Sequence, residues 1–103
     1  MKSIHLAFTA FVVLTGCQTS TDTVPLITTE AARHSGQSAS TLREGRFLFV
    51  RRCIECHALP VVSHHRAEDW PAIVARMSAR ADLKSAERDA IIAYVVTLRQ
   101  LRQ

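Results

Sequence analysis

Cys53-Ile54-Glu55-Cys56-His57 is the stretch from which the rest of the chain is best interpreted. Its two thiols are three residues apart, and an imidazole follows the second one directly. Residues i and i+3 share one face of a helical turn, so both sulfurs can reach a single flat cofactor. In a chain whose first residues predict export, this pattern is typical of a covalent haem attachment site. Cys53 and Cys56 would bond the haem as thioethers, and His57 would bind the iron through Nε2 as the proximal ligand.

Two other uses of a C-x-x-C pair suit this sequence less well. A thioredoxin-like dithiol belongs to a βαβ context, and no stretch of the chain alternates in the manner of strands. A structural zinc site needs a second pair of ligands at a similar spacing, which His64 and His65 could supply. A non-haem thiol protein is therefore a remote alternative.

Length and charge predict one small domain. The chain has 103 residues and a formal net charge of +4. Without an N-terminal signal and tether, roughly 60 residues would remain to fold. At this size hydrophobic burial alone gives marginal stability, and a cross-link or bound cofactor is usually needed. A covalently held haem would supply this additional stability. The mild basic balance comes from dispersed arginines, and we expect no nucleic-acid partner.

Residues 1–16 predict a lipoprotein-type signal peptide. The apolar run from Ile4 to Leu14 is too short for a membrane-spanning helix and suits a secretory signal. It ends in Leu14-Thr15-Gly16-Cys17, which resembles the bacterial lipobox, and the resemblance implies that Cys17 carries lipid. The following Gln18 resembles proteins passed on to the outer membrane, so we expect an anchored protein on the periplasmic side. Ordinary signal cleavage nearby, with Cys17 discarded or free, is the alternative.

Residues 17–40 predict the lipidated cysteine and a flexible tether. This stretch is dense in Thr, Ser and Ala and poor in apolar residues, so it cannot bury enough surface to order itself. A short helix from Thr28 to His34, packed on the domain, is the alternative.

Residues 41–103 predict an all-α domain. Thr41 and Glu44 form a capping box that would begin the first helix, which then runs into the haem motif. A second helix starts near Ala67, and a last one has Ser85 as its N-cap. The apolar residues of these two helices recur at helical spacing. They are Trp70, Ile73, Val74 and Met77 in the second helix, and Ile91, Tyr94, Val95 and Leu98 in the last.

The run from Gly45 to His57 resembles the N-terminal helix and attachment loop of the class I c-type cytochromes. That resemblance implies a small cytochrome c-like fold around one covalent haem c, and it extends from Thr41 to Gln103. It also implies that Gly45 lets the N-terminal helix cross the C-terminal helix closely, where Phe49 meets Tyr94. Without the family, a glycine in mid-helix still indicates a close backbone approach.

The second axial ligand is expected from the helix that Trp70 leads. The run from Trp70 to Met77 looks like small cytochrome domains in which such a helix delivers a methionine to the iron, with Trp70 as an apolar wall. The chain departs from the more familiar members, because they place the methionine in a loop with proline after it, whereas Ser78 follows Met77. His64, His65 and an open or water-bound position are the alternatives.

The loop after His57 is expected to hold its ring. A haem-ligating histidine usually gives its other ring N–H to a carbonyl. The carbonyl of Pro60 is a candidate acceptor.

These features predict an electron-transfer protein and not an enzyme. A haem whose axial positions are both filled by protein has no place for substrate, so one-electron exchange with redox partner proteins at the membrane is its expected chemistry. The alternative is a haem ligand-binding, sensor or small peroxidase-like protein with an open distal iron site. The sequence makes no prediction of the oligomeric state.

Overall fold

The computed structural model describes residues 24–102, and every regular element within them is helical. The α-helices are α1 (Thr29–Ser35), α2 (Ala39–Cys53), α3 (Trp70–Arg80) and α4 (Ser85–Gln100), and the 3-10 turns are η2 (Val62–His64) and η3 (Ala67–Asp69). The all-α prediction is thus confirmed. The predicted signal peptide and Cys17 lie outside the described residues. Across residues 24–102, no helix has both the length and the apolarity that a bilayer crossing requires.

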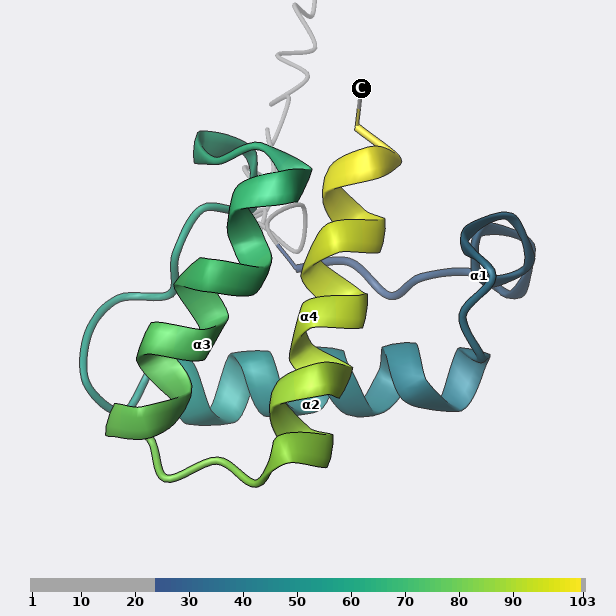
Figure 1. Ribbon diagram of the computed structural model, residues 1–103. Coiled ribbons are helices and arrows are strands. Elements are labelled where there is room, and N and C mark those ends of the chain that lie inside the picture. Colours follow the sequence, from purple (N-terminus) through teal and green to yellow (C-terminus); the bar gives the residue numbers. More distant parts are fainter. Residues whose placement is uncertain (1–23, 103) are drawn as a thin grey trace, which may run out of the picture.

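A close crossing of α2 and α4 organises the domain, and α3 lies beside α4 (Figure 1). A Cβ added to Gly45 would overlap the carbonyl of Ala90 and lie 2.8 Å from the Cβ of Tyr94. One turn later, Phe49 is buried with its ring centroid 6.1 Å from that of Tyr94. The predicted close approach at Gly45, with Phe49 meeting Tyr94, is confirmed.

The core lies where α2, α3, α4 and the loop before α3 converge. Its buried members are Leu48, Phe49, Val62, Trp70, Val74, Ala90, Ile91, Tyr94, Val95 and Leu98. The four apolar residues predicted at helical spacing in the last helix are all buried, as expected for residues that share one face.

Two helices begin differently from the prediction. Ser38, whose backbone is extended, caps α2, because its Oγ accepts the N–H of Thr41 at 3.1 Å. Thr41 is therefore inside the helix. At α4, the N–H of Lys84 donates to the carboxylate of Glu87 at 2.8 Å, so Ser85 is the first helical residue and not the cap. In both places a second polar residue of the same turn competes for the capping role.

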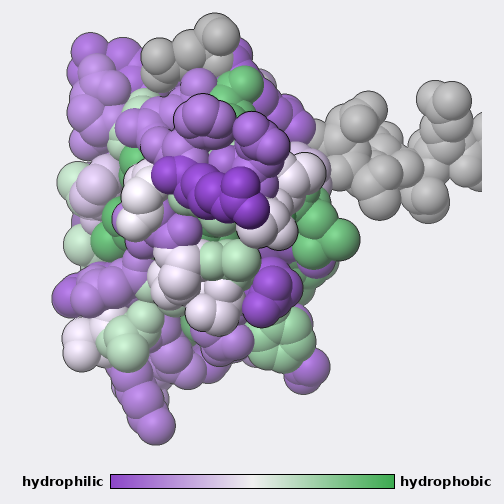
Figure 2. Space-filling model, turned by 90° about the vertical axis from the view of Figure 1, so that its right-hand side faces the viewer, coloured by the Kyte–Doolittle hydropathy of each residue, from purple (hydrophilic) through white to green (hydrophobic). Residues whose placement is uncertain are grey.

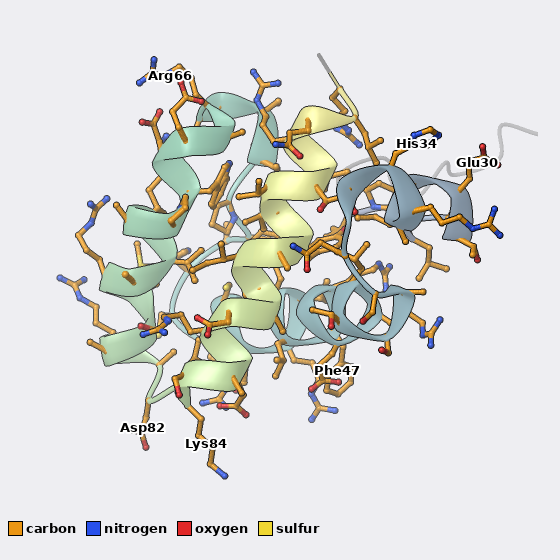
Figure 3. All side chains as sticks on the ribbon, turned by 45° about the vertical axis from the view of Figure 1, so that its right-hand side comes forward. Glu30, His34, Phe47, Arg66, Asp82 and Lys84 are labelled. Atoms are coloured by element: carbon orange, nitrogen blue, oxygen red, sulfur yellow. The ribbon has the colours of Figure 1, made fainter. Side chains whose placement is uncertain are left out.

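Residues 24–40 are more ordered than the tether expected there. Thr28 caps α1 by accepting the N–H of Ala31 at 3.2 Å, and Gly36 ends that helix in the left-handed conformation. Glu30 and His34 project from α1 into solvent (Figure 3). Figure 2 shows the face that carries α1, on which hydrophilic residues predominate.

The segment before α1 is held by side chains of the helical core. Arg46 Nε donates to the carbonyl of Val24 and the Tyr94 hydroxyl donates to the carbonyl of Pro25, both at 2.8 Å. Val24 and Ile27 pack against the core. Because these partners come from distant α2 and α4, the local composition of the segment could not reveal its order.

Candidate functional site

An apolar pocket lies between the C-terminal end of α2, the loop after it, α3 and the start of α4. Its cavity measures about 110 Å³ and is partly open to solvent. Cofactor sites are typically lined mainly by apolar side chains. Cys53, Cys56, His57, Trp70 and Met77 all line this pocket. The structure thus brings together five residues that the sequence predicts for one haem site.

The two thiols stand at the end of α2. Cys53 is its last residue, and Cys56 follows in the turn after it. Both are free cysteines, with Cys53 half-buried and Cys56 exposed. Burial raises the pKa of the Cys53 thiol, and the neighbouring Cys56 raises it further. Cys53 is therefore a neutral thiol at neutral pH, unlike the thiolates that act as nucleophiles or metal ligands.

The imidazole of His57 has a defined tautomer. Its Nδ1 lies 2.7 Å from the carbonyl oxygen of Ala58. A carbonyl can only accept, so Nδ1 carries a proton, and in the neutral imidazole Nε2 then has the lone pair that a metal would bind. The acceptor is not Pro60, which lines the pocket instead. The chain bends at His57 and Ala58.

The apolar residues predicted at helical spacing in α3 contribute both to the core and to the pocket wall. Trp70 is 1% exposed, and its Nε1–H donates to the carbonyl of Val62 at 3.2 Å. Its ring also meets Phe49 edge-on, with the centroids 6.3 Å apart. Ile73, Val74 and Met77 continue the wall along the helix. The Met77 thioether is half-buried and belongs to this wall.

The alternative distal ligands lie elsewhere. His64 and His65 are exposed, and neither is among the described residues that line the pocket. The His65 ring meets Trp70 edge-on at 5.4 Å, and its carbonyl accepts from Arg99 Nε at 2.8 Å. Of the three side chains considered as distal ligands, Met77 shares the pocket with His57.

The sequence did not indicate two arginines of the pocket, Arg52 and Arg80. Arg52 Nη2 donates to the carbonyl of Ala81 at 2.6 Å. Its buried Nε has no hydrogen-bond partner, and the Glu55 carboxylate is 3.6 Å away, within ion-pair range. Basic residues in the last turn of a helix are usually explained by the helix dipole, so no signal singled these two out.

The donor set fits a haem better than a bare metal ion. Between residues 24 and 102, no three His, Cys, Asp or Glu side chains are grouped to hold an ion. A haem needs few protein donors, because its ring supplies the equatorial ones. The pocket offers two thiols, an imidazole with a free Nε2, one thioether and apolar walls.

Comparison of this chain with protein-family models, with curated proteins and with solved structures finds no match. Its function is therefore inferred from its own residues and geometry.

Proposed function

We propose that this chain is a mono-haem c-type cytochrome that carries single electrons. The observation that supports the proposal most is the convergence of four side chains on one apolar pocket. Cys53, Cys56 and His57 come from the end of α2 and its loop, whereas Met77 comes from α3. Core packing by itself would not require a free imidazole nitrogen beside two thiols and a thioether.

Each residue has a distinct role in this proposal. Cys53 and Cys56 would hold the cofactor by thioether bonds, and the side chains of His57 and Met77 would bind its iron. A haem bound in this way supplies one-electron exchange between ferric and ferrous iron. The Ala58 carbonyl orients the imidazole and increases its basicity. The soft thioether of Met77 and the apolar side chains of Trp70 and Ile73 favour the ferrous state.

Access to the pocket suits a carrier. Cys56 and His57 are exposed, so the pocket reaches the surface on the side of the attachment loop. Electrons can enter and leave there without any opening of the fold. With His57 and Met77 both bound to it, the iron would have no place for a substrate, and no enzymatic activity is proposed.

The proposed carrier works on the periplasmic side of a membrane. The proposal rests on Leu14-Thr15-Gly16-Cys17 alone, which lies before the described residues. Several acyl chains on Cys17 would anchor the protein stably. The anchor then raises its effective concentration near redox partners in the same membrane. Fractionation of Cys17→Ala, which should leave the membrane fraction, tests this part.

The ferric absorption spectrum of protein matured with a haem-attachment system tests the assignment. We expect a weak sulfur-to-iron charge-transfer band at the red end that disappears in Met77→Ala. His64→Ala and His65→Ala are matched controls and should keep it. Cys53→Ser/Cys56→Ser should carry no covalent haem.

Two outcomes would contradict the proposal. A colourless wild-type protein would exclude haem attachment. High-spin iron that binds cyanide readily in the wild type would favour a ligand-binding, sensor or peroxidase-like protein.

A further inference from the structure

The walls of the pocket are tied together at both ends of α3. The N-terminal end of α3 meets α2 through the rings of Trp70 and Phe49. The C-terminal end meets α2 through the hydrogen bond from Arg52 Nη2 to the Ala81 carbonyl. Between these two points the helices pack mainly on α4 and little on each other (Figure 1). The Arg52 bond therefore spans an opening that the backbone itself does not close.

Ala81 connects this bond to Met77. Ala81 is the C-cap of α3, and its N–H donates to the carbonyl of Met77 at 2.9 Å. Its own carbonyl accepts from Arg52. The last carbonyls of a helix lack partners within the helix, so a guanidinium is a strong substitute for them. One residue thus links the last turn of α3, which begins at Met77, to the arginine that precedes Cys53.

The environment of Arg52 restricts the orientation of its side chain. Its side chain is 31% exposed, and its Nε is buried with the Glu55 carboxylate 3.6 Å away. A guanidinium that is partly buried and held at two points loses little further freedom when it binds a carbonyl. A rigid contact of this kind can hold the end of α3 at a set distance from the end of α2.

We infer that Arg52 is a positioning residue for Met77, holding the thioether against the haem by tying the end of α3 to the end of α2. This inference rests on the proposed haem site. Without the tie, α3 would swing away from the pocket more often, and Met77 would leave the iron more often. An external ligand that competes with Met77 binds in proportion to the fraction of protein in that open state.

The experiment is an imidazole titration of the ferric, haem-loaded protein. Arg52→Ala should raise the apparent affinity for imidazole on the order of tenfold, the effect of losing one charge-assisted hydrogen bond. Arg52→Lys keeps a cationic donor and should restore part of the difference. Arg51→Ala is the matched control on the same turn, because Arg51 stacks on the exposed Phe47 ring and not on α3.

A second control separates positioning from plain stability. Val95 is fully buried in α4 and does not line the pocket. Val95→Ala should lower the unfolding midpoint but leave the imidazole affinity unchanged. An equal gain of affinity in Val95→Ala and Arg52→Ala would overturn the inference.

Met77→Ala distinguishes failure of the inference from failure of Met77 as the proposed distal ligand. If Met77→Ala binds imidazole much more tightly than the wild type while Arg52→Ala does not, Arg52 has no positioning role. If Met77→Ala and the wild type bind imidazole equally, Met77 is not the distal ligand, and the inference falls together with that part of the proposed function.

Discussion

Gly45 and His57 show how single atoms decide this structure. At Gly45, the absence of a Cβ allows α2 to lie against the backbone of α4 at Ala90. At His57, one short contact with the Ala58 carbonyl determines which ring nitrogen is free. The first feature holds the core together, and the second prepares the proposed proximal ligand.

Gly45→Ala should destabilise the protein in spite of the better helix propensity of alanine. The gain in propensity is about 1 kcal/mol. The new Cβ would overlap the Ala90 carbonyl, and the backbone of a packed helix must then move. We expect a net loss of about 2–3 kcal/mol in the free energy of unfolding, measured by chemical denaturation.

Gly36→Ala is the contrasting control for that prediction. Gly36 has a φ of +70°, but nothing lies within 4 Å of an added Cβ. Its cost should be about 1 kcal/mol, from the left-handed backbone alone. A neutral or stabilising Gly45→Ala would show that the α2–α4 crossing is looser than described.

Among the helices, α3 contributes the most residues to the pocket. It begins with the buried Trp70, carries Met77 on the pocket wall, and ends at Arg80, which Ala81 and Asp82 follow. Asp82 has a φ of +51°, and the N–H of Leu83 donates to the Ser78 carbonyl at 3.0 Å. This left-handed turn satisfies a late carbonyl of the helix. In Figure 3, Asp82 lies just beyond the C-terminal end of α3, and Arg66, which precedes η3, lies near the opposite end.

Substitutions at Asp82 should therefore rank by their tolerance of a positive φ. Asp82→Gly removes the steric cost of that conformation and should be neutral or stabilising by up to about 1 kcal/mol. Asp82→Ala keeps the cost without the local hydrogen bonding of an aspartate and should be destabilising by about 0.5–1 kcal/mol. Thermal unfolding of the three proteins gives the order. Equal melting temperatures for Gly and Ala would contradict this account of the turn.

At the scale of the whole molecule, helices α2 and α4 contact both the N-terminal segment and the pocket. Tyr94 of α4 connects these elements, because its ring packs on Phe49 of α2 and its hydroxyl donates a hydrogen bond to the Pro25 carbonyl. Burial raises the pKa of Tyr94 to about 12, although the nearby Arg46 and Arg102 partly oppose the rise.

Stability should fall as the pH rises from about 10 to about 12. An unfolded tyrosine ionises near pH 10, whereas the folded Tyr94 ionises near pH 12. Between these values the unfolded chain binds fewer protons, so its formation is favoured as the pH rises. Melting temperatures measured across this range should decline more steeply in the wild type than in Tyr94→Phe. The same decline in both proteins would contradict a buried, protonated Tyr94.

Tyr94→Phe also removes the hydrogen bond to Pro25. At neutral pH we therefore expect it to be less stable by about 1 kcal/mol. Since the chain has one tyrosine, its near-ultraviolet absorption reports the ionisation of Tyr94 directly.

Local pattern was sufficient for much of the fold. The 3.6-residue spacing of apolar residues predicted the buried faces of α3 and α4, because the period of a helix fixes which residues share a face. A glycine within a helical pattern predicted the close crossing, because it is costly there unless a neighbour needs the space. The positions of the caps were less predictable, since Ser38 and Thr41, or Ser85 and Glu87, lie within one turn and compete.

The sequence by itself determined the chemistry of the candidate site: two thiols at i and i+3, the imidazole beside them, and the methionine at the end of an apolar stripe. Only the tertiary structure decided that Met77 shares a pocket with His57 while His64 and His65 do not. It alone decided that Arg52 reaches Ala81 and that Val24 and Ile27 pack against the core. The physical reason is range: spacing along the chain fixes contacts within a few residues, whereas these contacts depend on how α2, α3 and α4 cross.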